Sequence, residues 1–136
     1  MVKEAAKGYN VKIEVKGDAE ILANDGVYSV FENLIGNAVK HGKASRIEVD
    51  IQKSGNSVRI RIADDGKGIP VMDKIFEEGF TTGSGSGLGL YIVKKLVESF
   101  GGSIKVERSV PRGTVFVLEF PRIVSLVKFS SAQMPL

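Results

Sequence analysis

Two short segments in the middle of the chain, residues 47–51 and 58–62, alternate apolar with polar or charged side chains. Side chains of a strand point to opposite faces in turn, so each segment predicts a strand with one apolar face. The intervening Ser54-Gly55-Asn56 is typical of a hairpin turn. Because the apolar face of a sheet must be buried against another layer, this hairpin demands a second layer of structure.

Two amphipathic segments predict that layer. One begins with an N-cap at residues 24–25 and runs to about His41, where Gly42 is expected to end the helix as the C′ residue. The other opens at Leu88 and closes at residues 101–102. Their apolar residues recur mostly at steps of three and four, as a core-facing stripe requires: Val27, Val30, Phe31, Leu34 and Ala38 in the first helix, and Leu90, Ile92, Val93, Leu96, Val97 and Phe100 in the second.

Further strands are expected at residues 11–15, 19–22, 104–106 and 115–120, with a turn at 111–113 and a short helix at 71–76. This order predicts an α+β fold, a two-layer α/β sandwich. Its mixed, mostly antiparallel sheet should have about five strands, covered on one face by about three helices. With 136 residues, we expect one domain over residues 9–121. Residues 1–8 would be the end of a linker. The tail, 122–136, could be an extra edge strand, an interface segment or an appended piece.

Composition excludes several classes of protein. The chain has no Cys and a single His, so disulfide scaffolds, thiolate nucleophiles and zinc clusters built on Cys or His are excluded. Its net charge of +3 comes without any block of like charges, which argues against nucleic acid as a partner. No apolar run is long enough to cross a membrane. We therefore expect a cytoplasmic location and no membrane contact.

Polar residues follow one stripe of the first helix. Asn33, Asn37, Lys40 and His41 stand at i, i+4, i+7 and i+8, beside the apolar stripe rather than opposite to it. Amide oxygens can bind a hard cation and a lysine can bind phosphate, so this stripe is a candidate site. The alternative is that these residues are only the solvated side of the helix.

A second candidate is Asp64-Asp65-Gly66-Lys67-Gly68, at the end of a predicted strand. A carboxylate at the floor of a pocket can accept a hydrogen bond from the exocyclic amine of adenine, and glycine lets a ligand approach the backbone. A plain Asp-Gly turn is the alternative. Acid–base chemistry on a sugar is disfavoured, because carboxylates adjacent in sequence rarely face one site.

A third candidate is the glycine-rich segment 79–89, in which five of eleven residues are Gly and which opens directly into a helix. Backbone N–H groups at a helix N-terminus bind anions, so the segment predicts a phosphate site, with a flexible linker as the alternative. It lacks the P-loop sequence and the dinucleotide-binding pattern of a Rossmann fold. The chain also lacks the catalytic motifs of eukaryotic protein kinases.

Four segments in order resemble the N, G1, F and G2 boxes of the catalytic ATP-binding domain of sensor histidine kinases, which has the Bergerat fold of the GHKL class. They are residues 33–41 (NLIGNAVKH), 64–70 (DDGKGIP), 75–82 (IFEEGFTT) and 85–90 (GSGLGL). Gly101-Gly102 and Gly113-Thr114 also resemble that family's closing hairpin. The resemblance spans about residues 9–121. Each box is weak alone, but four in order at suitable spacing are a specific signal.

The resemblance implies a role for each matched residue. Asp64 would bind the adenine amino group in a pocket shaped by Gly68, with Thr114 nearby. Gly66 and Ile69 would also belong to the nucleotide site. Asn37 would ligate Mg²⁺, Asn33 and Lys40 would hold the phosphates of ATP or the product ADP, and His41 would flank the nucleotide. Asn33, Asn37 and Lys40 would thus form the catalytic set. Residues 77–87, with Thr81, Thr82 and Gly85, would form a lid anchored by Phe76 and Phe80. Gly87, Leu88, Gly89 and Leu90 would contact the phosphates at the helix start. One departure is that no basic residue follows Phe80 until Lys94, so the resemblance supplies no lid cation for the γ-phosphate.

The resemblance also implies partners. Histidine kinases phosphorylate a His on a separate helical dimerisation domain, which passes the phosphoryl group to an Asp of a response regulator. His41 does not match that acceptor, which is usually followed by an acidic residue and a nearby Pro, whereas Gly42-Lys43 follow His41. The chain would then be the nucleotide-binding part of a longer sensor, with 1–8 leading from the helical domain. We expect it to be monomeric and to turn over ATP poorly alone.

Two other functions are consistent with the same fold. DNA gyrase, heat-shock chaperone ATPases, mismatch-repair ATPases and anti-sigma factor kinases usually carry a Glu four residues before the Mg²⁺-binding Asn. Here that position is Asn33, and Glu32 is one step of about 100° away, which argues against a self-sufficient ATPase. A domain that kept the fold and lost the chemistry would instead serve as an interaction module.

Overall fold

The computed structural model describes residues 11–21, 26–68, 74–77, 89–108, 112–121 and 127–130. Its main sheet has five strands in the order β1-β3-β4-β6-β5. These are β1 (Lys12–Lys16), β3 (Arg46–Ser54), β4 (Ser57–Asp64), β6 (Val115–Pro121) and β5 (Ser103–Arg108). β1 runs parallel to β3, and every other neighbouring pair is antiparallel. The sheet is mixed and mostly antiparallel, as predicted.

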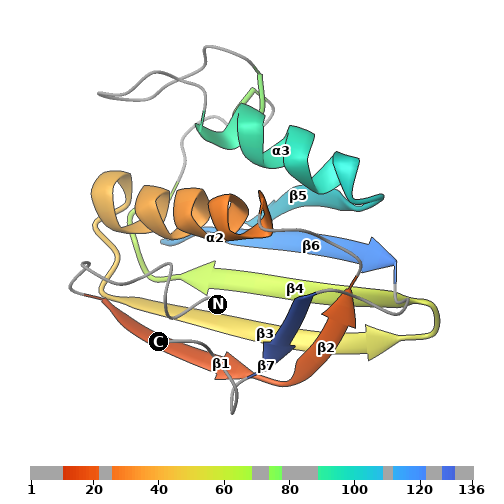
Figure 1. Cartoon of the computed structure of the whole chain (residues 1–136). Helices are drawn as coiled ribbons and strands as arrows, with labels where there is room; N and C mark the ends of the chain where they lie inside the picture. The colour runs from red at the N-terminus through yellow and green to blue at the C-terminus, as the bar shows by residue number, and fades with distance from the viewer. Residues whose placement is uncertain are drawn as a thin grey trace.

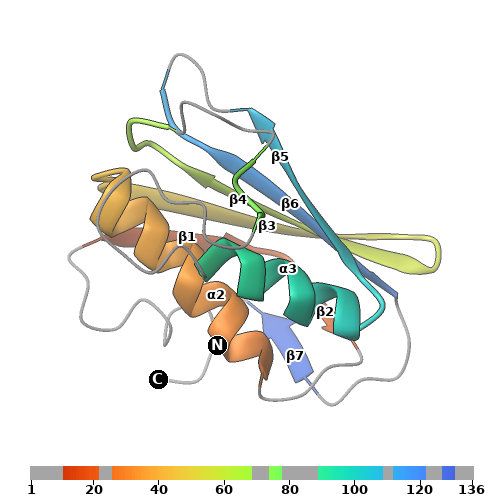
Figure 2. The ribbon, with the colours of Figure 1, turned by 90° about the horizontal axis from the view of Figure 1, so that it is seen from above.

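Helices α2 (Gly26–Gly36) and α3 (Gly89–Ser99) lie side by side on one face of this sheet (Figures 1 and 2). The alternation of the strands decides which face they cover. Ile47, Val49 and Ile51 of β3 are at most 5% exposed and contribute to one core with the helices. Their partners on the neighbouring strands continue that apolar face: Val58, Ile60 and Ile62 of β4, Phe116, Leu118 and Phe120 of β6, and Ile104 of β5. The fold is the predicted two-layer α/β sandwich.

The opposite face of the sheet is charged. Arg46 forms ion pairs with Glu14 at 2.9 Å and with Glu48 at 3.1 Å, and Arg59 pairs with Glu119 at 2.9 Å. All of these side chains are at least one-third exposed, so the pairs contribute little to stability. They show that much of this face is in water, although Val115 and Val117 of β6, which alternate with Phe116 and Leu118, are buried there. The hydrophobic core cluster itself lies on the helix side.

A second, two-stranded sheet pairs β2 (Asp18–Ile21) with β7 (Val127–Ser130) in antiparallel register (Figure 1). The short extended piece predicted at 19–22 is therefore present. Of the three possibilities for the tail, its described part is a strand, although one paired with β2 rather than at the edge of the main sheet. Ala19 of β2 is buried in the main core, which holds this ribbon to the domain.

The first predicted helix is α-helical only to Gly36 and continues as a π-helical turn, η1 (Asn37–His41). The N–H of Gly42 donates to the carbonyl of Asn37 at 3.0 Å, five residues back. A β-carbon at Gly42 would lie 2.8 Å from the carbonyl oxygen of Ala38, so only glycine permits this close turn. Each residue of a π-helix turns through a smaller angle than in an α-helix, so the polar stripe that begins at Asn33 is interrupted after Asn37.

The predicted helix end was wrong in one respect. Gly42 has right-handed helical angles, φ −85° and ψ −15°. The left-handed residue is the next one, Lys43, at φ 58°, and it is the one described non-glycine residue with positive φ. The wide π turn delays the C′ position by one residue, and the Ala44 N–H then donates to the carbonyl of Ala38 at 2.9 Å.

Two further expectations need correction. The short helix predicted at 71–76 is a turn where the structure describes it, at residues 74–77, so the described chain has two α-helices and η1 rather than three helices. Ile92, placed in the apolar set of α3, is 41% exposed, because Val93 and Val97 define the buried side of that helix.

The N-cap expected at residues 24–25 lies outside the described residues. Within the described chain, no helix has the length and apolar character that a membrane span requires.

We predict that Lys43→Gly stabilises the domain. Left-handed angles cost a residue with a β-carbon about 1 kcal/mol or more, and glycine avoids this cost. Part of the gain is offset by the greater freedom of glycine in the unfolded chain, which leaves up to about 1 kcal/mol. Urea unfolding of Lys43→Gly and of the control Lys43→Ala would test this. Lys43→Ala keeps a β-carbon and should show no such gain; equal stabilisation by both would contradict the explanation.

Candidate nucleotide-binding site

The predicted site residues that the structure describes gather at one end of the molecule. The carboxyl end of β4, the end of α2 with η1, and the start of α3 all lie there (Figures 1 and 2). These elements come from distant parts of the chain and meet because both helices cross the same sheet face. The structure therefore brings together the regions of the N box, the G1 box and the end of the G2 box.

Asp64 is the last residue of β4 and lies against the start of β6. Its N–H donates to the carbonyl of Thr114 at 3.0 Å, and its Oδ1 accepts a 2.8 Å hydrogen bond from the N–H of Gly66. Thr114 is 4% exposed and is the one buried polar side chain among the described residues. The predicted proximity of Asp64, Gly66 and Thr114 is thus present, as a half-buried polar corner at the end of an apolar strand.

The position of Asp64 changes its acidity. Burial raises its pKa above the ordinary 3.8, hydrogen bonds from the backbone of Gly66 and Thr114 oppose this rise, and the nearby charge of Asp65 adds to it. A carboxylate that gives up solvation in this way is a strong acceptor for a ligand N–H group. Perturbed carboxyl groups of this kind are found more often at functional sites than elsewhere.

Asn33 lies half-buried between the two helices. Its Nδ2 donates to the carbonyl of Ser29 at 2.8 Å, one helical turn back, which fixes the orientation of the amide. Its Oδ1 faces Gly89, the first residue of α3: a β-carbon at Gly89 would lie only 3.2 Å from it. Glycine at this position therefore lets the start of α3 approach Asn33, and the predicted phosphate residues of both helices meet here.

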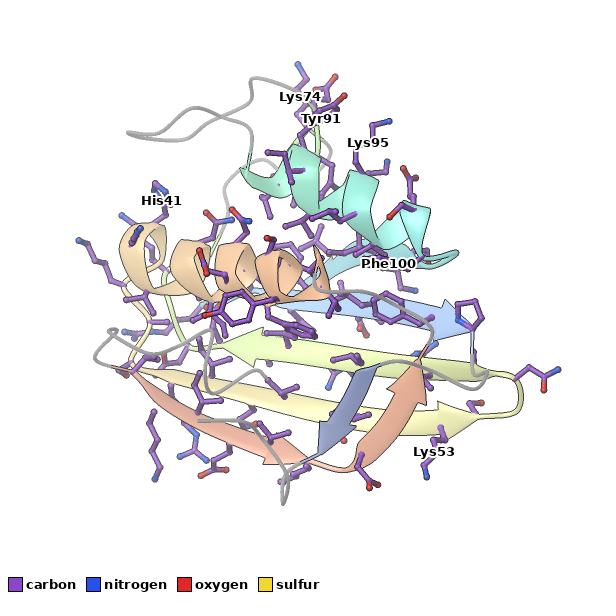
Figure 3. All side chains as sticks on the ribbon, in the orientation of Figure 1. His41, Lys53, Lys74, Tyr91, Lys95 and Phe100 are labelled. Carbon is purple, nitrogen blue, oxygen red and sulfur yellow. The ribbon has the colours of Figure 1, made fainter. Side chains whose placement is uncertain are left out.

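Asn37, Lys40 and His41 belong to η1. Asn37 and His41 are half-buried and Lys40 is exposed. His41 projects from the helix end on the side away from the sheet (Figure 3). The described residues contain no group of three His, Asp or Glu side chains that could enclose a metal ion. A single amide ligand fits Mg²⁺, which is usually bound by one or two protein groups together with phosphate oxygens and water.

Phe76 lies in a small aromatic cluster beside the core. Its ring meets that of Phe116 edge-to-face, with centroids 6.3 Å apart, and the Nζ of Lys94 lies 5.9 Å from its centroid. In the sequence, Lys94 was identified only as the first basic residue after Phe80 of the F box. The structure places Lys94 on α3 over the Phe76 ring, at a distance typical of a cation–π contact.

The remaining predicted residues fall into two groups. Gly68 follows the Asp64 turn with φ 83°, and Leu90 packs against the core from the first turn of α3. Ile69, Phe80, Thr81, Thr82, Gly85, Gly87 and Leu88 lie outside the described residues. Sequence reasoning named Asp65 only as part of its second candidate segment and gave it no role of its own. Its carboxylate caps the loop after η1 rather than facing the Asp64 corner. No pattern in the sequence links Asp65 to Ser45 and Arg46, which are 20 and 19 residues away.

A hollow of about 80 Å³ exists on the charged face of the sheet, lined by Glu14, Lys16, Glu48, Asp50 and Arg61, with Val49 and Ala63 between them. Pockets that bury a nucleotide-sized ligand have volumes of several hundred Å³. This hollow is also on the wrong side of the sheet from the predicted residues. It is not the candidate site.

Comparison with known proteins identifies the family of the chain. Residues 23–123 match the family described as histidine kinase-, DNA gyrase B- and HSP90-like ATPases. The chain belongs to this family, and its sequence and fold are those of the ATP-binding catalytic domain of sensor histidine kinases.

Curated relatives are sensor kinases from bacteria. The sensor histidine kinase AruS of Pseudomonas aeruginosa is 40% identical over 121 residues, which are 78% of this chain and 12% of AruS. The sensor protein BceS of Bacillus subtilis is 34% identical over 125 residues, 84% of this chain and 36% of BceS. This chain therefore spans only a minor part of the length of these relatives.

Solved structures show the same fold. The ATP-binding domain of PrrB from Mycobacterium tuberculosis superimposes with a TM-score of 0.73 at 29% identity, covering 90% of this chain and 88% of that one. The mycobacterial sensor histidine kinase MprB gives 0.72 at 27% identity, covering 88% and 91%. Full-length ShkA, solved in complex with AMPPNP, gives 0.76 at 28% identity, covering 90% of this chain and 29% of ShkA.

We predict that Asp64→Asn makes the fold more stable at pH 7. Because burial raises the pKa of Asp64 in the folded state, its ionisation lowers the free energy of unfolding progressively as the pH rises from 3.8 through the folded pKa, and the full cost persists at higher pH. Asn keeps the acceptor for Gly66 and avoids that cost. The advantage of Asn should shrink as the pH falls toward 3.8, where the wild-type carboxyl becomes protonated. Urea titrations between pH 4 and pH 7 would measure it, and a variant less stable at pH 7 would contradict the expected sign.

We predict that the end of the fold that carries Asp64 requires glycine at position 113. Its φ of 86° is left-handed, and a β-carbon would collide with the carbonyl oxygen of Asp64. Gly113→Ala should therefore destabilise the domain by roughly 3 kcal/mol or more. Gly55 in the β3–β4 turn is the matched control, because its φ is 60° but nothing lies within 4 Å of its added β-carbon. Gly55→Ala should cost about 1 kcal/mol. Chemical denaturation would compare the losses in free energy of unfolding. A larger loss in Gly113→Ala than in Gly55→Ala would reflect the collision in addition to backbone strain, whereas equal losses would argue against the collision.

Proposed function

We propose that this chain is the catalytic domain of a sensor histidine kinase. It would bind Mg²⁺-ATP and transfer the γ-phosphoryl group to a His on a separate dimerisation and phosphoacceptor domain, for relay to an Asp of a response regulator. The observation that carries the proposal is the half-buried Asp64 corner, set at the same end of the fold as the Asn33–Gly89 contact. The Asp64 corner has the chemistry to bind adenine, and the Asn33–Gly89 contact has the chemistry to bind phosphate.

Adenine recognition would rest on Asp64. A carboxylate accepts hydrogen bonds and donates none when ionised, so it can bind the exocyclic amino group of adenine and not a carbonyl oxygen at the same position. The N–H of Gly66 fixes one of its oxygens, and the buried Thr114 lies next to it. Partial burial strengthens the hydrogen bond to a ligand, because water competes less for the carboxylate.

Phosphate binding would rest on the meeting of the two helices. The start of α3 at Gly89 offers backbone N–H groups and the positive end of the helix dipole. Asn33 lies against that helix start, and Lys40 of η1 would add a positive charge. Asn37 would hold Mg²⁺, which neutralises the charge of the phosphates when bound. Glycines 85 and 87, Leu88 and the lid residues Thr81 and Thr82 would complete this end.

The transfer itself needs a nucleophile from another domain. The lone pair of a His imidazole nitrogen forms the bond to the γ-phosphorus as the bond to the β–γ bridging oxygen breaks, and ADP leaves with that electron pair. The remaining imidazole proton passes to water or to a base of the acceptor domain. The part played by this chain is positioning and electrostatic stabilisation. We expect the domain to work in the cytoplasm, as a monomer when separate from its acceptor domain.

A self-sufficient ATPase is less well supported. In that case a carboxylate would have to activate the attacking water next to the Mg²⁺-binding Asn37. Glu32 is exposed, whereas Asn33 occupies the half-buried position facing Gly89. The amide of Asn33 donates to Ser29 and cannot act as a general base. An interaction module without nucleotide remains as the outcome that a failed binding experiment would favour.

The first test is calorimetric titration of the purified chain with ADP and ATP, with and without Mg²⁺. We expect binding that reaches full strength only with Mg²⁺. Asp64→Asn should weaken it by about tenfold or more, since hydrogen bonds to a charged acceptor are the stronger kind. Asp50→Asn is the matched control, because Asp50 accepts a hydrogen bond from Gln52 on the opposite face of the sheet.

Phosphotransfer is tested next, by supplying a histidine-kinase dimerisation domain in trans with radiolabelled ATP. We expect label on the acceptor His, strongly reduced by Asp64→Asn at sub-saturating ATP and unchanged by Asp50→Asn. If saturating nucleotide gives neither heat nor thermal stabilisation of the wild-type chain, the catalytic function is wrong for this protein.

A further inference from the structure

The carboxylate of Asp65 joins two loops through three hydrogen bonds. Its Oδ1 accepts from the N–H of Ser45 at 2.8 Å and from the N–H of Arg46 at 3.0 Å, and its Oδ2 accepts from the hydroxyl of Ser45 at 2.8 Å. These bonds hold the pKa of Asp65 below its ordinary value. Both oxygens are thus engaged by the same short segment, although the residue itself is exposed.

Backbone contacts extend the same junction. The Asp65 N–H donates to the carbonyl of Arg46 at 3.2 Å, and the Lys67 N–H donates to the carbonyl of Gly42 at 2.8 Å. Gly66 is packed directly on that carbonyl, since a β-carbon there would lie 2.6 Å from the Gly42 oxygen. We call this junction of residues 42–46 with residues 65–67 the loop staple.

The loop staple connects the two halves of the candidate site. Residues 42–46 directly follow η1, which bears Asn37, Lys40 and His41. Residues 65–67 directly follow Asp64. A nucleotide bound as proposed would contact η1 with its phosphates and Asp64 with its base. The separation between those two contacts is therefore set by the staple and by the sheet that carries Asp64.

We propose that Asp65 is a positioning residue for nucleotide binding: through its hydrogen bonds to Ser45 and Arg46 it holds the phosphate-binding end of η1 in register with the adenine-binding Asp64. The inference rests on the proposed function, because it assumes that one ligand spans both halves. Asp65 need not touch the nucleotide, since its two oxygens face the 45–46 loop. Its loss should affect ligands that reach η1 and spare a ligand that uses the Asp64 corner alone.

Ligand size provides the test. Asp65→Ala removes all three side-chain bonds, and we expect it to weaken Mg²⁺-ADP about tenfold while adenosine binding changes by less than about twofold. Asp65→Asn keeps an oxygen that can accept from both N–H groups and should restore Mg²⁺-ADP to within about threefold of the wild type. Calorimetry would measure Mg²⁺-ADP and NMR titration would measure adenosine, both well below the unfolding midpoint.

Controls separate this role from mere stabilisation. Asp50→Ala removes a comparable carboxylate from the far face of the sheet and should leave both affinities unchanged. An equal loss for the two ligands in Asp65→Ala, no loss for either, or no rescue by Asn would each overturn the positioning role. If Asp65→Ala does not fold, Ser45→Ala provides a second test, because it deletes only the hydrogen bond from the Ser45 hydroxyl. It should weaken Mg²⁺-ADP binding two- to threefold and leave adenosine binding unchanged. An unchanged affinity for Mg²⁺-ADP would then count against the positioning role of Asp65. A wild-type chain that binds no Mg²⁺-ADP would instead refute the proposed function.

Discussion

The pairing of β4 with β6 is the constraint on which the rest of the site depends. It runs as an antiparallel ladder and ends where the N–H of Asp64 meets the carbonyl of Thr114. Every second rung before that end buries apolar side chains under the helices, whereas the end itself delivers a carboxylate and a hydroxyl-bearing residue. Gly113 allows β6 to begin in direct contact with Asp64. The apolar β4–β6 ladder thus ends in the polar pair Asp64 and Thr114, whose position is set by the strand register.

At Asp64, the requirement for a stable fold conflicts with the requirement for ligand binding. The ionised form of Asp64 is disfavoured by its surroundings, as the direction of its pKa shift indicates. Folding alone would favour a neutral side chain at that position. A carboxylate that is costly in the empty domain regains part of that cost when a ligand N–H group donates to it. Such a residue is what a binding site requires and what a purely structural turn does not, which is why the plain-turn interpretation of the Asp64 segment is the weaker one.

The sequence predicted the elements whose periodicity is set by burial and missed those set by hydrogen-bond geometry. The strict alternation of apolar and charged side chains over residues 47–51 identified β3, just as steps of three and four identified α2. Asp64 could be picked out as a site residue because it ends such a periodic strand. The end of the helix at His41 was predicted correctly, but the π turn after Gly36 has no such signature, so the left-handed C′ residue was placed at Gly42 instead of Lys43. The role of Asp65 was overlooked because its partners, 20 and 19 residues earlier, are brought near only by the fold.

On the proposed function, the domain would bring little side-chain chemistry of its own to phosphoryl transfer. Where the structure describes the meeting of α2 and α3, Asn33 occupies the position facing Gly89, and the neighbouring carboxylate of Glu32 is exposed. Asn33 can orient phosphate but cannot take a proton. A site of this composition would lower the barrier by holding charge and geometry, and the rate would then depend on when a nucleophile is presented to it. On the proposed function, control of phosphorylation then lies in the approach of the acceptor domain, while the loop staple keeps this domain's own two halves ready for the nucleotide.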